Sequence, residues 1–384
     1  MSGKRVLIIG GGASGLLAAS AAAEAGADVT VLESAKKPAA KLRRTGNGHC
    51  NMTNTGDLPA FYEPKCRAFA EQVLKNEPVE RTLAFFREIG IVTRTRDGLV
   101  YPMSEEASCV ADALVRAAEE RGARIRMNEL VTGAAREKGG FSVFTEGWRY
   151  ESDAVILACG SPAGLPKGSP DGYGIAEALG HSVNPARPAL VPLRCDPPLP
   201  ELAGLRVRGE VTLLVDGREE DRETGQIQFS AKGISGICVM NLSIAAGRAA
   251  DEGRRVSLLL NLLGHCGEPD DVLARCLPSV IPERLLKVLR RKHGDAEIVS
   301  LLRGLPLPVD GTAGFPDAQA ARGGVPAEEV NPDTMESRIT EGLYFSGEIL
   351  DVTGKCGGAN LQFAWSTGRI AGRSAAGSPL HRPV

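Results

Sequence analysis

The feature that most constrains this chain is a run of glycines near its start. Gly10, Gly12 and Gly15 fit the pattern Gly-x-Gly-x-x-Gly, after the apolar segment 6–9 (VLII) and before the alanine-rich segment 16–25. This order predicts a buried strand, a tight turn and a helix. The first glycine permits the turn, the second lets a pyrophosphate approach the backbone, and the third lets helix and strand pack closely. The run therefore predicts a βαβ dinucleotide-binding unit with the phosphates at the helix N-terminus.

An acidic residue follows at the distance that this unit requires. Segment 28–33 (DVTVLE) is predicted to be the second strand and ends at Glu33, 18 residues beyond Gly15. A carboxylate there accepts hydrogen bonds from a ribose diol and repels a 2′-phosphate. The fingerprint alone does not separate NAD from FAD.

Two later segments favour FAD. Segment 154–160 (AVILACG) resembles the second nucleotide-contact strand of flavoproteins with two dinucleotide-binding domains. Segment 342–351 (GLYFSGEILD) resembles their strand and turn whose acidic residue, here Glu348, meets the ribityl chain. The chain has no second Gly-x-Gly-x-x-Gly. A nicotinamide donor, NAD(P)H, would therefore dock transiently as a substrate.

The order of strand-like and helical segments along the chain predicts that the nucleotide-binding domain is discontinuous in sequence. At 384 residues it is long enough for two or three domains. We predict an α/β protein in which a Rossmann-like FAD-binding domain spans 1–187 and 309–384. A β-rich insertion over 188–265 and a helical segment over 266–308 interrupt it.

Composition sets expectations for partners and location. The net charge of −2 shows no overall footprint for nucleic acid, and no apolar stretch approaches the ~20 residues that span a bilayer. Nine cysteines without a CxxC pair, and no signal-peptide pattern, favour a cytoplasmic protein with reduced thiols. No cluster has metal-ligand spacing. We therefore expect a small-molecule substrate, no nucleic acid, no membrane and no metal, and the oligomeric state stays open.

With segments 43–54 (RRTGNGHCNMTN) and 354–369 (GKCGGANLQFAWSTGR) added, nearly the whole chain resembles the BaiN/YhiN-like bacterial flavoproteins, a branch of the glutathione-reductase-type FAD superfamily. The resemblance implies that the 46–53 loop helps to hold FAD and that 357–362 lies against the isoalloxazine ring. A final helix is predicted to start near Asn360, and glycine at Gly358 is expected to keep a side chain away from the ring.

The motifs and the resemblance together assign cofactor binding to one set of residues. They are Gly10, Gly12, Ala13, Ser14, Gly15, Glu33, Ser34, Lys41, Gly46, Asn47, Gly48, Cys50, Asn51, Val131, Ala158, Gly160, Gly347, Glu348, Gly358, Asn360 and Leu361. No His or Cys sits in an attachment pattern, so noncovalent FAD is expected.

The catalytic acid or base is not fixed by sequence; the candidates are His49, Lys232 and Tyr101. His49 stands where relatives often carry Arg, and its alternative role is a loop histidine bonded to backbone. Lys232 belongs to a segment, 230–232 (SAK), where many relatives have Thr-His. Cys50 and Cys356 are interpreted as structural thiols.

The predicted function is an FAD-dependent oxidoreductase, linked to NAD(P)H, that transfers hydride through flavin N5 to or from a small organic substrate. The resemblance suggests reduction of an enone-type double bond. One alternative is a flavin-dependent amine oxidase that uses oxygen. An alternative of another class is a non-catalytic flavin-bound redox sensor.

Overall fold

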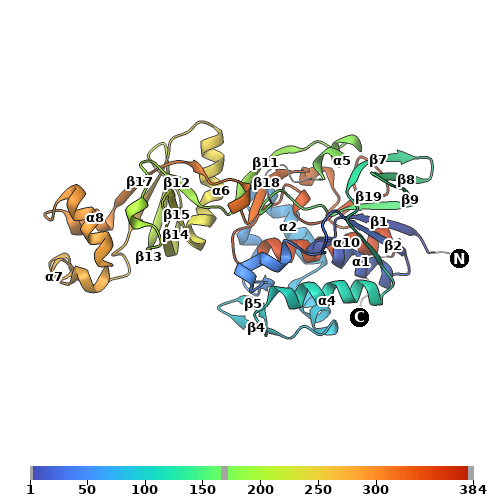
Figure 1. Cartoon of the computed structure of the whole chain (residues 1–384), viewed down its shortest axis with the longest axis horizontal. Helices are drawn as coiled ribbons and strands as arrows, with labels where there is room; N and C mark the ends of the chain where they lie inside the picture. The colour runs from blue at the N-terminus through green and yellow to red at the C-terminus, as the bar shows by residue number, and fades with distance from the viewer. Residues whose placement is uncertain (1–2, 166–171, 379–384) are drawn as a thin grey trace. The chain divides into compact units, whose positions relative to one another are not determined.

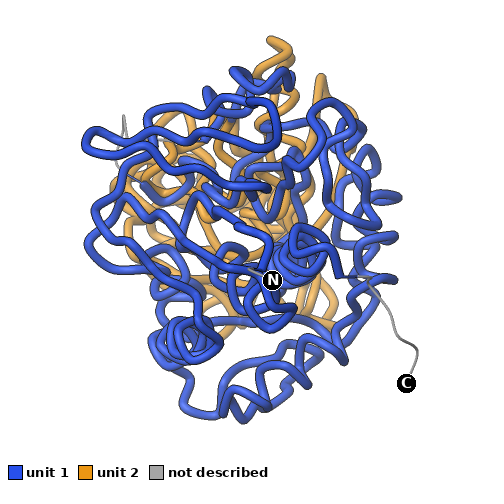
Figure 2. Tube along the Cα trace, turned by 90° about the vertical axis from the view of Figure 1, so that its right-hand side faces the viewer, with its two compact units in different colours: residues 1–186, 321–384 blue, residues 187–320 orange. Residues whose placement is uncertain are grey.

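The fold comes from a computed structural model that describes residues 3–165 and 172–378. The chain forms two compact units, one of residues 1–186 and 321–384 and the other of residues 187–320. Figure 2 shows them in different colours. The nucleotide fold is thus discontinuous in sequence.

A five-stranded parallel sheet forms the centre of the first unit. Its order is β19-β10-β1-β2-β6, with bounds β19 Leu343–Phe345, β10 Ala154–Leu157, β1 Arg5–Ile9, β2 Asp28–Glu33 and β6 Arg124–Met127. Parallel strands that are covered on both faces consist of continuous apolar residues. For this reason VLII and AVIL could be recognised as strands from the sequence. The predicted α/β fold with a Rossmann domain is confirmed.

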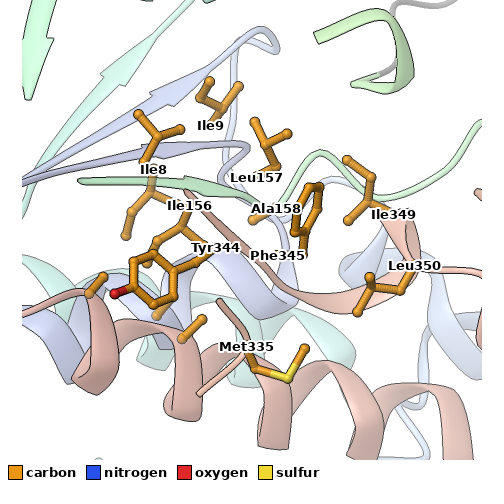
Figure 3. Packing of buried hydrophobic residues seen from close by; sticks show 14 of the residues in the cluster. Ile8, Ile9, Ile156, Leu157, Ala158, Met335, Tyr344, Phe345, Ile349 and Leu350 are labelled. Carbon is orange, nitrogen blue, oxygen red and sulfur yellow. The ribbon is translucent and has the colours of Figure 1, made fainter. Parts of the chain in front are cut away.

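Helices cover one face of this sheet, and a small antiparallel sheet covers the other (Figure 1). The helices are α1 (Ala13–Glu24), α4 (Ala107–Glu120) and α10 (Ala359–Ala375). The small sheet consists of β7 (Val131–Glu137), β8 (Gly140–Thr145) and β9 (Arg149–Ser152). In the core, Ile8, Ile156 and Tyr344 come from three adjacent strands and lie in register with one another (Figure 3).

A second small sheet, β3-β5-β4, lies beside the start of α10, with β3 at Thr53–Asn54, β4 at Thr93–Arg96 and β5 at Leu99–Pro102. The fully buried Trp365 of α10 donates from its indole Nε1 to the Met52 carbonyl at 2.9 Å. The first turns of α10 are therefore anchored to the chain just before β3.

The second unit is a closed six-stranded barrel with four helices. The barrel order is β12 (Leu193–Cys195), β15 (Gly233–Ser235), β14 (Arg218–Phe229), β13 (Arg206–Val215), β16 (Val256–Asn261) and β17 (Leu305–Thr312). The helices are α6 (Ile237–Asp251), α7 (Asp270–Val280), α8 (Glu283–His293) and α9 (Ile298–Arg303). The predicted β-rich insertion and its helical segment are both present.

Two details of the insertion differ from the sequence-based expectation. The unit continues to Ala320 rather than ending at 308, because β17 pairs with both β16 and β12 and so closes the barrel. Helix α6 lies in a region that was expected to be strands. Its apolar residues occupy nearly every face, so no clear helical stripe marked it.

Candidate functional site

Two glycines of the turn are required by the packing of the protein itself, and a third is not. A Cβ on Gly15 would lie 1.9 Å from the Gly10 carbonyl oxygen, and one on Gly10, whose φ is +107°, would lie 2.5 Å from the Ala158 carbonyl oxygen. A Cβ on Gly12 would meet nothing within 4 Å. The open space at Gly12 therefore fits a ligand that approaches the backbone, as a pyrophosphate does.

The start of α1 faces this space. Gly12 is the N-cap and makes no side-chain capping bond, and the helix proper begins at Ala13. A helix N-terminus presents backbone N–H groups and a partial positive charge, which together suit a phosphate. Buried Ser14 donates from its hydroxyl to the Ser346 carbonyl at 3.2 Å, which ties this turn to the end of β19.

Glu33 is oriented by the backbone around it. Its carboxylate accepts from the Gly11 N–H and the Ala35 N–H, both at 2.7 Å. A carboxylate has about four acceptor positions, so it can still accept from ribose hydroxyls. Exposed Ser34 lies beside it. The segment before Val131 reaches the same end of β2, because the Glu129 N–H donates to the Glu33 carbonyl at 2.9 Å.

We expect Glu33→Ala to weaken FAD binding by about 1.5–3 kcal/mol, since hydrogen bonds to a charged group contribute that much. The measurement is a titration of apoprotein with FAD. Asp28→Ala is the control, because Asp28 begins the same strand and pairs with Arg124 on the surface. Equal dissociation constants for the Glu33 and Asp28 variants would contradict the assignment of Glu33 to FAD binding.

Lys41 and Glu348 bring four separate chain segments together at one point. The Lys41 ammonium donates to Glu348 Oε2 and lies 3.5 Å from the Oγ of buried Ser161, just after Gly160. The other carboxylate oxygen, Oε1, accepts from the Ala321 N–H at 3.0 Å. The Gly347 N–H donates to the Thr367 hydroxyl of α10 at 2.9 Å and holds the turn.

The 46–51 loop has an unusual backbone. Gly46, Asn47, Gly48 and Cys50 all have positive φ, between +55° and +91°. The Asn51 amide, in the orientation that satisfies both of its ends, donates to the Thr53 carbonyl at 2.9 Å and accepts from the Gly358 N–H at 3.2 Å. The loop is thus joined directly to the residue that precedes α10.

The start of α10 is tightly packed, and the protein itself gives a reason for glycine at 358. A Cβ on Gly358, whose φ is +93°, would lie 2.5–2.7 Å from backbone atoms of Thr53, so β3 requires the glycine. Asn360 exchanges two hydrogen bonds with Gly354, at 2.8 and 2.9 Å. Leu361 is partly buried against the α1–α4 core. Helix α10 begins at Ala359, one residue before the expected start.

The three catalytic candidates come from separate segments of the chain, two in the first unit and one in the second. His49 is exposed, and its Nδ1 is hydrogen-bonded to the Glu105 carbonyl at 3.1 Å. Tyr101 is half-buried on β5, in the same unit. Lys232 is exposed and belongs to the other unit, just before β15.

Cys50 is a buried thiol rather than a reactive thiolate. Burial raises the pKa of the Cys50 thiol to about 12, so it stays protonated at neutral pH. We expect Cys50→Ala to retain most of the wild-type rate of flavin reduction, measured anaerobically by stopped flow. Loss of that rate with FAD still fully bound would restore a redox role for this cysteine.

Sequence reasoning missed the groups that support the acid at 348. Ser161, Thr367 and the backbone N–H of Ala321 are ordinary residue types with no local motif, and they meet only because a turn, a helix and a strand from distant parts of the chain converge there. Among residues 3–165 and 172–378, no group of three or more His, Cys, Asp or Glu side chains could hold a metal ion. Within those same residues, no helix has the length and apolarity to cross a membrane.

This protein is an FAD-dependent oxidoreductase with a Rossmann fold. Three features define the class: the glycine turn after β1, the acid that ends β2, and the Gly-Glu turn after β19. The family described as HI0933-like protein Rossmann domain matches residues 4–374, and the chain belongs to this family.

Curated relatives agree with that placement, and a solved structure shares the fold. The chain is 36% identical to the 3-dehydro-bile acid delta(4,6)-reductase of Clostridium scindens, over 98% of this chain and 100% of the relative. It is 30% identical to the ribosomal RNA dihydrouridine synthase of Escherichia coli, over 94% and 95%. The fold is shared with a 3-ketosteroid-delta4-(5alpha)-dehydrogenase from Rhodococcus jostii, with a TM-score of 0.54, 16% identity and 97% of each chain covered.

The dihydrouridine synthase corrects one expectation. A net charge near zero led us to exclude nucleic acid as a partner, but a relative that covers almost the whole chain is named for a reaction on ribosomal RNA. The net charge of a whole protein is a poor predictor of RNA binding, because an enzyme of this size contacts RNA through only part of its surface. The charge of that local surface determines the affinity.

Proposed function

We propose that this enzyme reduces a carbon–carbon double bond conjugated to a carbonyl group. One observation supports this most strongly: two relatives named for very different substrates share that reaction. A delta(4,6)-reductase of a 3-dehydro steroid saturates double bonds in line with a ketone. A dihydrouridine synthase saturates the uracil ring bond next to a carbonyl. Keeping the reaction while the substrate changes fits a site in which FAD contributes the chemistry and the protein selects the substrate.

FAD, when bound, supplies the hydride from its N5 atom. The residues that we propose to hold it are the fingerprint turn, Glu33, the 46–51 loop, Glu348 and the start of α10. The α10 N-terminus would stabilise negative charge at its end, because a helix N-terminus carries about half a positive charge. In the product, the carbon farther along the conjugated system gains the hydride, and the carbon next to the carbonyl gains a proton.

We propose that a small cyclic enone is the substrate and NAD(P)H the donor. Greater identity and full coverage by the bile acid reductase support the small substrate. The second candidate, uridine in RNA, is supported by the dihydrouridine synthase. Incubation of the enzyme with NADH or NADPH and either a 4,6-dien-3-one steroid or ribosomal RNA, followed by mass spectrometry, separates them. We expect a gain of two hydrogens by the steroid; a gain by uridine alone would select RNA.

We also expect FAD to be bound noncovalently. Acid precipitation of the purified protein should release all of its yellow colour into the supernatant. Colour that stays with the precipitated protein after washing would demonstrate a covalent bond.

A further inference from the structure

Lys41 places a positive charge beside the acidic residue that follows β19. It belongs to the loop after β2, and that loop is fixed to the fingerprint because the Ala39 N–H donates to the Gly11 carbonyl at 2.8 Å. Its ammonium reaches across to Glu348 in the turn after β19. The glycine turn thus holds the loop that carries Lys41, and Lys41 in turn pairs with the acid that follows the last strand of the sheet.

Glu348 has both carboxylate oxygens engaged from the protein side. Oε1 accepts from the Ala321 N–H at 3.0 Å, and Oε2 accepts from Lys41. The Glu348 side chain is 21% exposed and that of Lys41 is 34% exposed, so the pair is only partly screened by water. Two donors on opposite oxygens fix the direction of the carboxylate, as supporting groups do for ligands of a binding site.

FAD would bring a doubly negative pyrophosphate to the glycine turn, and the turn that carries Glu348 lies beside Ser14 at the start of α1. A partly buried carboxylate repels that charge unless a cation neutralises it. We infer that Lys41 is a positioning residue for FAD binding, which acts through Glu348 by neutralising and aiming its carboxylate rather than by touching FAD. This inference rests on FAD binding at the glycine turn and is independent of the substrate proposed above.

The test is a double-mutant cycle on FAD affinity, because such a cycle isolates the coupling between two residues. The proteins are wild type, Lys41→Met, Glu348→Gln and the double variant, each prepared as full-length apoprotein and titrated with FAD. We expect Lys41→Met to weaken binding at least tenfold when Glu348 is present. In the Glu348→Gln background, where no charge remains to be neutralised, the same change should have little effect.

Two further variants make the cycle decisive. Lys36→Met removes an exposed charge from the same loop and measures the long-range attraction of a lysine for FAD. Lys41→Arg keeps the charge and should restore affinity to within about threefold of wild type. Thermal unfolding of each apoprotein confirms that the fold is kept.

The outcomes separate clearly. If Lys41→Met weakens FAD binding equally in the wild-type and in the Glu348→Gln background, Lys41 contacts FAD directly and the inference is overturned. If its effect is no larger than that of Lys36→Met, Lys41 supplies only general charge, and the inference is again wrong. Failure of the enzyme to reduce any enone would leave these affinities unchanged, so the proposed function is tested separately.

Discussion

Gly12→Val should abolish tight FAD binding while the apoprotein stays folded. The position has an ordinary φ of −82°, and a Cβ there meets no protein atom within 4 Å, so the side chain fits the apoprotein. It would fill the space that we assign to the pyrophosphate. Losing one charged hydrogen-bonded contact costs up to about 3 kcal/mol, which is more than a hundredfold in Kd. Apoprotein stability should change by no more than about 1 kcal/mol, the usual scale of a capping effect.

FAD titration and thermal unfolding of the apoprotein measure the two effects. Gly147→Val, at another open position in an exposed turn, is the matched control and should change neither. Gly15→Ala provides the contrast, since its Cβ would overlap the Gly10 carbonyl oxygen and the fold itself should fail. A Gly12→Val protein that binds FAD with wild-type affinity would show that no ligand approaches this turn.

Gly358→Ala should destabilise the protein by at least about 2 kcal/mol, even without FAD. A non-glycine residue in the left-handed region costs roughly 1–2 kcal/mol. Here the Cβ would also overlap the Thr53 backbone at 2.5–2.7 Å. Backbone atoms within a sheet cannot move aside as a flexible side chain can, so both costs should apply.

Gly253→Ala is the control for the backbone strain alone. Gly253 also has positive φ, +73°, but a Cβ there meets nothing within 4 Å. Urea unfolding of the apoproteins should therefore show a larger loss for Gly358→Ala than for Gly253→Ala. Equal losses would mean that β3 relaxes away from α10, and closeness to the flavin would again be the better reason for the glycine.

Local signals made the nucleotide half of this protein predictable. The glycine run had to follow a buried strand, and a strand ending in Glu33 had to come next; both are properties of neighbouring residues. The boundary at Ala320 was not predictable in this way, because β17 joins the barrel through pairings with strands about 50 and 110 residues earlier. Helix α6 could not be predicted from the sequence, because a helix with apolar residues on nearly every face has no hydrophobic periodicity of 3.6 residues.

The same distinction holds within the site. Lys41 and Glu348 were each nominated from motifs, but nothing in the sequence showed that they pair, since 307 positions separate them. Gly358 was nominated for closeness to the flavin, and the structure adds a contact with the Thr53 backbone that the sequence did not show, because Thr53 comes from a distant segment. Sequence therefore identifies which residues are special more readily than what they contact.

We propose that this flavoenzyme delivers hydride to a double bond conjugated to a carbonyl. The most direct test is a single turnover without a nicotinamide: the FAD-loaded enzyme is reduced with dithionite under anaerobic conditions and mixed with a 4,6-dien-3-one steroid. We predict rapid return of the oxidised flavin spectrum and one equivalent of reduced steroid, with no reoxidation by the matching saturated ketone. Reduced flavin that persists with the dienone and with uridine-containing ribosomal RNA, but is reoxidised by air, would contradict the account and support an oxidase.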